Sequence, residues 1–418
     1  MGNYFSTETP EPVKPEEEAN EAASVIQNVW KKKEQGAEFK WPDNLYLELM
    51  DMAETDQMVG YVALLFKAAR EAKEPFKGLQ SIVGLSESAP NAEKPKLTLA
   101  QIQSIVEDNK EALSKSAAFS DVTTPQDMLD ALTKISNRTS GRKLAIVNLN
   151  PVELARGDMP YAIVKDDKLK RITVAFNSKN SALKSDWILQ RSYRQRNVKL
   201  PRALKAKISG DRITHVKQHE GFSLYLTRGG VNSLSNQIIN DLLPVLTPKY
   251  KLYVTGHGMA GALATLLAFH VAFDSTIPTP VSCVTLGSPR VGDASFWRAS
   301  YLLEISGKLR TCRIVTDSDT LPTIPASKDY AHAGYQLRLS PSSKLVKPQE
   351  YYPAVKDDGS LRKPAFQSTK KFNASKSDPQ TYLECIEMNQ EALVELDLNE
   401  LYKQAGVDVF SAAYAVDE

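Results

Sequence analysis

The stretch that most constrains the fold runs from Lys251 to Phe269 and reads KLYVTGHGMAGALATLLAF. It opens with β-branched and aromatic residues (252–255), the composition of a buried strand. The small residues from Gly256 to Gly261 then let the backbone turn through unusual φ/ψ values. Residues 262–269 are good helix formers with no breaker. The stretch predicts a strand, a tight turn and a buried helix, and the alternating strands and helices around it predict an α/β sheet.

The composition bounds the class of protein. The chain has 418 residues, 42% of them apolar, enough for one large domain with appendages or for two domains. The net charge of +2 gives no basic field, so we expect no nucleic-acid partner. Cys283, Cys312 and Cys385 show no metal-ligand spacing and leave one thiol over in any pairing, which predicts reduced thiols, no metal and no cofactor.

Targeting signals are sparse. No apolar run approaches the ~20 residues of a transmembrane helix, and the acidic N-terminus lacks the apolar core of a secretory signal. Residues 1–6, MGNYFS, fit the N-myristoylation pattern at Gly2, although a chance match remains an alternative. Residues 1–20 predict a disordered tail. We therefore expect an intracellular protein on the cytoplasmic side that is not secreted, with Gly2 as a candidate contact to a membrane surface.

Residues 21–35, EAASVIQNVWKKKEQ, predict an amphipathic helix with a basic end. Ile26, Gln27 and Trp30 match the first half of an IQ motif, the helix that calmodulin-like proteins bind. The second half departs, because Gly36 stands where a second basic residue is usual. Two interpretations follow. Either the helix binds a calmodulin-like partner, or it docks Ile26 and Trp30 on its own domain or on a neighbour, which we favour.

The pattern along the chain predicts three further regions. Apolar spacing predicts an all-helical module over 21–140, with two helices in 43–72 and a helix that begins at Pro125 with Thr124 as its N-cap. Short strands separated by turns predict a second domain over 143–340. Residues 341–418 read as a C-terminal extension with a helix.

Several motifs resemble those of one family. The strand–turn–helix stretch resembles the nucleophile elbow of the class 3 (fungal-type triacylglycerol) lipases, Gly-His-Ser-Leu-Gly-Gly, with Gly258 where the serine belongs. Further motifs follow in the family's order: VAF at 174–176, Asp186-Trp187, HEGF at 219–222, GSPRVG at 287–292, DSDTLP at 317–322 and DYAHAG at 329–334. The resemblance covers about residues 143–340 and implies the α/β-hydrolase fold.

The resemblance also implies site residues, because acyl transfer on this fold uses a triad in the order Ser, Asp, His with two oxyanion donors. Asp319 stands in the Asp-x-Leu-Pro segment, where the family has its aspartate, and His332 stands where we expect its histidine. Asp317 precedes by two residues and would point to another face. The oxyanion donors would come from Asn177, in a loop that departs from the family's Arg-Gly-Thr, and from Met259.

Gly258 has no atom that can attack a carbonyl, and loss of a triad serine costs about six orders of magnitude in turnover. The separate departures at Asn177 and at Met259-Ala260 indicate natural loss of catalysis. The sequence thus predicts an inactive lipase-like protein, a structural or scaffolding subunit of a larger assembly with protein partners. The alternatives are an acyl-chain-binding module, and a residual lipid ester hydrolase that uses Asp319 and His332.

Overall fold

The computed structural model describes residues 44–71, 76–78, 96–119, 123–150, 159–178, 194–200, 215–327, 329–340, 343–352 and 378–404. Several predicted features lie outside these residues: Gly2, Ile26, Gln27, Trp30 and the Asp186-Trp187 motif.

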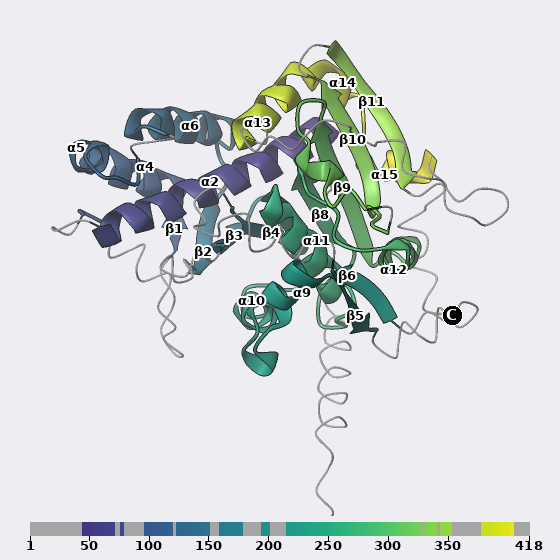
Figure 1. Cartoon of the computed structure of the whole chain (residues 1–418). Coiled ribbons are helices and arrows are strands. Elements are labelled where there is room, and N and C mark those ends of the chain that lie inside the picture. Colours follow the sequence, from purple (N-terminus) through teal and green to yellow (C-terminus); the bar gives the residue numbers. More distant parts are fainter. Residues whose placement is uncertain are drawn as a thin grey trace, which may run out of the picture.

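A nine-stranded mixed sheet forms the centre of the molecule, in the order β1-β2-β3-β4-β7-β8-β9-β10-β11 (Figure 1). The strands from β4 to β10 run parallel, while β1 to β3 at one edge and β11 at the other pair antiparallel. The bounds are β1 Leu97–Thr98, β2 Leu144–Asn150, β3 Tyr161–Asp166, β4 Arg171–Phe176, β7 Lys251–His257, β8 Val281–Leu286, β9 Leu309–Thr316, β10 Gly334–Ser340 and β11 Ser343–Tyr352. A separate two-stranded ribbon joins β5 (Gln195–Lys199) to β6 (His215–His219). The sheet confirms the α/β class.

Helices cover both faces of the sheet. One face packs on α9 (Glu220–Thr227), α10 (Leu234–Leu242), α11 (Met259–Val271) and α12 (Ala294–Ile305). The other face packs on α2 (Leu45–Glu71), on α4 (Leu99–Asp108), α5 (Lys110–Ser114) and α6 (Pro125–Arg138), and on α13 (Pro379–Met388), α14 (Gln390–Val394) and α15 (Leu398–Gln404). In β4, alternate side chains enter the two cores, as the pleat requires.

The helix α2 is one continuous helix of 27 residues, where the sequence predicted two. It crosses the sheet obliquely and is the violet helix in Figure 1. Several of its acidic side chains are buried, with Glu48, Asp51 and Glu54 all at most 6% exposed. A helix buried on several sides need not show one apolar stripe.

Buried ion pairs explain how these carboxylates enter the core. Arg310 of β9 donates to Glu48, with Nη2 2.7 Å from Oε2, and the Tyr253 hydroxyl donates to the same carboxylate at 3.0 Å. One turn further along α2, Arg171 of β4 donates from Nη2 to Asp51 Oδ2 at 2.8 Å. Each acid therefore meets an arginine that projects from a different strand of the sheet.

The sheet and the N-terminal helices share a core. One apolar cluster combines Val59 of α2, Leu132 of α6 and Ala175 of β4, and a second combines Leu49 of α2 with Ile314 of β9. We expected the helices before residue 140 to form a module apart from the sheet. They pack instead as a layer of the same body, because α2 supplies apolar and acidic groups to the sheet along its length.

Asp51 makes the fold sensitive to acid. Burial alone would raise the pKa of its carboxyl, but Arg171, Arg142 and Arg138 together hold that pKa below its ordinary value. A carboxyl with a lowered folded pKa stabilises the fold above its unfolded pKa of about 3.9, and this stabilisation is lost as the pH falls through the folded value.

We expect the free energy of unfolding to fall between about pH 5 and pH 2, and we expect Asp51→Asn to make that decrease smaller. Urea denaturation along a pH series measures it, with Asp317→Asn, at an exposed ion pair, as control. An equal slope in Asp51→Asn would contradict the assignment.

Candidate active site

The predicted strand, turn and helix are present at the centre of the sheet. The strand β7 ends at His257 and α11 begins at Met259. Between them Gly258 has φ +58° and ψ −124°, a backbone conformation that L side chains rarely adopt, and its N–H donates to Leu286 O at 2.7 Å. This is the sharp strand-to-helix turn that presents a nucleophile in an elbow. The backbone of the elbow is kept while position 258 offers no side chain.

Two further glycines are required by packing within the turn. A Cβ atom on Gly256 would lie 2.7 Å from the Ala260 carbonyl carbon, and one on Gly261 would lie 2.9 Å from Gly256 O. Neither backbone group can move aside cheaply, so both positions require glycine. The turn is thus maintained by steric constraints that are independent of any chemistry.

Asp319 lies beyond the end of β9 and is 1% exposed. Its Oδ1 accepts from the Leu321 N–H at 2.8 Å, and its Oδ2 accepts from the Tyr382 hydroxyl of α13 at 2.7 Å. Burial and then the adjacent Asp319 raise the pKa of Tyr382 well above its ordinary value, so its hydroxyl remains protonated and donates. The Tyr382 ring also meets the His257 ring edge-on, at 5.4 Å between centroids.

Asp317 occupies a different environment from Asp319. Its side chain forms an ion pair with Arg338 at the partly exposed rim of β10. The two carboxyls therefore lie in different environments, as the sequence predicted, and of the two only Asp319 is buried.

His332 precedes β10 and is half-buried. Its Nε2 lies 2.7 Å from Pro322 O. A carbonyl oxygen only accepts, so Nε2 carries the proton in this contact. In that state Nε2 has no lone pair with which to accept the proton of a nucleophile. Burial, followed by Arg313 and Arg290, lowers the pKa of His332 well below its ordinary value, so the ring is neutral at pH 7. Asp319 thus accepts from Tyr382, while His332 donates to Pro322 O.

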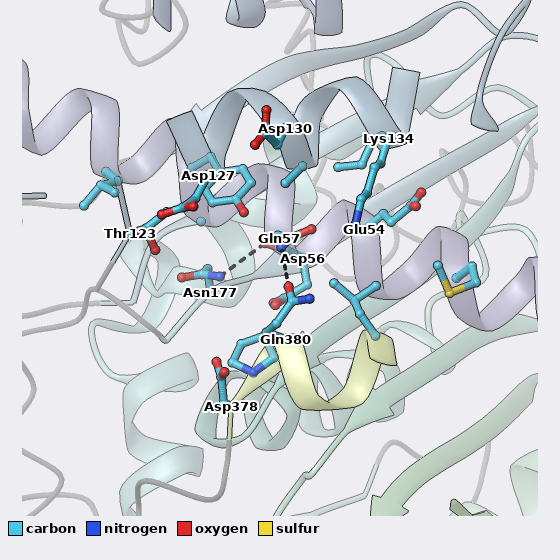
Figure 2. A pocket seen from close by; sticks show the side chains of 18 of the residues that line it. Glu54, Asp56, Gln57, Thr123, Asp127, Asp130, Lys134, Asn177, Asp378 and Gln380 are labelled. Carbon is cyan, nitrogen blue, oxygen red and sulfur yellow. Dashed lines mark hydrogen bonds between the residues drawn. The ribbon is translucent and has the colours of Figure 1, made fainter. Parts of the chain in front are cut away.

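Asn177, a predicted oxyanion residue, has its hydrogen-bonding groups engaged within the fold. Its N–H donates to Pro160 O at 3.0 Å, and its side-chain amide donates to Asp56 O of α2 at 3.2 Å (Figure 2). A Cβ atom on Gly60 would lie 2.7 Å from Asn177 Nδ2. Asn177 thus joins β4 to α2. Met259, the other predicted donor, is the first residue of α11, where helix N–H groups have no intrahelical partner.

A cavity of about 490 Å³ lies between α2, α6 and α13, and its lining includes none of Gly258, Asp319 and His332. Figure 2 shows Asp127, Asp130 and Lys134 of α6 on one wall and Asp378 opposite, at the start of α13. Burial, followed by Asp127 and Asp378, raises the pKa of Tyr61 on its wall to about 12. No local motif predicts this cavity, because its walls come from three helices far apart in the sequence.

The remaining candidate groups are the cysteines, the potential metal ligands and the helices. All three cysteines are buried free thiols. Among the described residues no group of three or more His, Cys, Asp or Glu is placed to hold a metal ion. Within the described ranges, every helix is too short or too polar to cross a bilayer.

Comparison with known proteins finds a family model and several relatives that match this part of the chain. Residues 174–328 match the family model described as Lipase (class 3). A rice (Oryza sativa subsp. japonica) protein, Phospholipase A1-II 3, is 30% identical over 141 residues, which cover 30% of this chain and 33% of the relative. A Rhizomucor miehei lipase is 25% identical over 191 residues, which cover 44% of this chain and 46% of the relative. The chain thus spans a third to a half of the length of these curated relatives.

Solved lipase structures are also similar. A deletion mutant of the Rhizomucor miehei lipase propeptide complex is 25% identical, with a TM-score of 0.34, covering 47% of this chain and 56% of that one. Lipase II from Rhizopus niveus is 21% identical, with a TM-score of 0.36, covering 68% of this chain and 81% of that one. With the family match, the elbow and the mixed sheet, residues 174–328 are identified as a domain of the class 3 lipase family on an α/β-hydrolase fold.

Proposed function

We propose that this protein is a catalytically inactive lipase-like protein that acts as a structural or scaffolding subunit. One observation carries the proposal: the elbow keeps its unusual backbone conformation while position 258 is glycine. The rest of the site agrees, because Asp319 bonds a tyrosine and His332 bonds a backbone carbonyl. Acyl transfer needs a nucleophile, a base that accepts its proton and donors for the oxyanion, and Gly258 supplies no nucleophile.

Ester hydrolysis tests this proposal. We expect the purified full-length protein to hydrolyse p-nitrophenyl butyrate no faster than buffer, because a site without its nucleophile loses about six orders of magnitude in turnover. An active fungal lipase serves as positive control and His332→Ala as the matched variant. Turnover that survives purification and disappears in His332→Ala would support the residual-hydrolase alternative, in which His332 and Asp319 activate water.

The acyl-chain-binding alternative requires an apolar chamber, since small-molecule pockets for such ligands are lined mainly by apolar side chains. In the cavity of Figure 2 apolar side chains such as Leu64 share the lining with several carboxylates, among them Glu54, Asp127, Asp130 and Asp378. These negative charges would repel the carboxylate of a fatty acid. We therefore expect no saturable binding of a fluorescent fatty acid. Saturation in the micromolar range would favour the lipid-binding function over the scaffolding one.

The scaffolding role rests on what the chain adds to the family segment. Outside residues 174–328, α2, α4–α6 and α13–α15 form an additional layer over one face of the sheet. An inert domain is useful to a cell only through its surfaces, so we infer that protein partners bind this layer on the cytoplasmic side of a membrane, with Gly2 as the modified residue. Pull-down from native cells, with mass spectrometry of the N-terminal peptide, tests both points. An unmodified N-terminus would remove the membrane contact from the proposal.

A further inference from the structure

The helices α13 and α14 carry an open groove that is lined by apolar and acidic side chains. Met388 and Val394 are 50% and 39% exposed, two of the four large apolar side chains that stand exposed in the described part of the chain. They line a groove of about 720 Å³ together with Glu387, Glu391 and Glu395. These three acids follow one another at intervals of four residues, all are exposed, and none forms an ion pair with another described residue. Exposed apolar residues ringed by like charges are typical of an interaction surface.

The N-terminal segment of the chain enters the described structure beside this groove. The Leu45 N–H at the start of α2 donates to Leu396 O at 2.7 Å, two residues beyond Val394. The chain before Asn44 therefore starts at one end of the groove. Asn44 lies nine positions after Gln35, and a chain of that length spans at most about 30 Å. The groove-lining residues 387–395 extend over only about 12 Å at helical rise. Residues 21–35 can reach the whole groove.

The segment matches the groove in chemistry. Ile26 and Trp30 are four residues apart, the spacing of two anchors on one helix face, and residues 31–33 are three consecutive lysines. We propose that residues 21–35 dock intramolecularly in the groove between α13 and α14, with Ile26 and Trp30 on Met388 and Val394. The lysines then face the acids at 387, 391 and 395. Charge complementarity selects the orientation, and the short tether raises the effective concentration of the segment.

Disulfide trapping in the full-length chain tests this docking. The variant Trp30→Cys/Val394→Cys is compared with Trp30→Cys/Val231→Cys, whose second position is 82% exposed and lies in the η2 turn (Gly230–Asn232) next to α10. The three native thiols are buried and do not compete. Under mild oxidation we expect the first pair to close within a monomer in at least about tenfold higher yield. Equal yields overturn the proposal. Crosslinked dimers would assign the groove to a second copy, and would overturn it as well.

Charge reversal tests the proposed contact between the lysines of the segment and the acids of the groove. Reversal of the three acids in Glu387→Lys/Glu391→Lys/Glu395→Lys should lower the yield of the 30–394 disulfide about tenfold, as expected for the loss of several exposed ion pairs. All three positions are exposed, so the fold should tolerate the change. Adding Lys31→Glu/Lys32→Glu/Lys33→Glu should restore the yield. Failure of this rescue overturns the proposed contact. Calcium-loaded calmodulin binding to the chain with no enrichment of the 30–394 disulfide would assign the segment to that partner instead.

Discussion

Arg310→Met is expected to lower the free energy of unfolding by about 3–5 kcal/mol, because it leaves a buried carboxylate without its counter-ion. Arg310 is 1% exposed and donates to both oxygens of Glu48, itself 2% exposed. Methionine fills much of the arginine volume, so the expected loss is electrostatic rather than a cavity effect. Urea denaturation at pH 7 measures it.

The matched control is the double variant Glu48→Gln/Arg310→Met. Removing both charges should recover most of the loss, since a buried pair replaced by neutral groups of similar size costs little. Lys403→Met, at the exposed pair with Glu400, should change stability by no more than about 0.5 kcal/mol. If the single and double variants at 310 lose the same stability, the pair contributes through packing alone and the electrostatic account of α2 is wrong.

This ion pair also shows where prediction from the sequence ended. Local patterns predicted several features well: the strand expected over 252–255 lies within β7, and Thr124 caps α6 with a capping box. These features depend on residues near one another in the chain. The continuity of α2 depends on partners such as Arg310, 262 residues away from Glu48. Without those arginines in view, the sequence does not show how the acids of α2 can be buried, and the continuity of the helix could not be predicted.

The candidate site likewise has features that the sequence predicted and features that it did not. The glycine turn at 256–261 could be predicted, because its small residues follow a strand and precede a helix. The contrast between Asp317 and Asp319 followed from their spacing along an extended segment. The environment of His332 could not be predicted, because a side-chain rotamer and a backbone carbonyl decide it. No local pattern predicted that Tyr382 would lie in the site. Its contact with Asp319 joins residues 63 apart.

Gly258→Ser is expected to lower the free energy of unfolding by about 1–3 kcal/mol and to restore no measurable turnover. The cost arises because φ +58° and ψ −124° strain any residue with a Cβ atom. The absence of turnover follows from the surrounding groups, since a serine at 258 needs a base and His332 holds its Nε2 proton against Pro322 O. Restoring one member of a cooperating set returns little, because triad residues act as a unit.

Gly258→Ala separates the two effects, since it imposes the same backbone strain without a hydroxyl. We expect both variants to lose the same stability in urea and both to hydrolyse p-nitrophenyl butyrate at the rate of buffer. A turnover above ~1 s⁻¹ in Gly258→Ser but not in Gly258→Ala would place the serine in the ordinary range of enzymes. His332 would then have to leave Pro322 O to accept the proton, so the hydrogen bonds of Asp319 and His332 would be no barrier to catalysis. The loss of activity would in that case rest on the glycine alone.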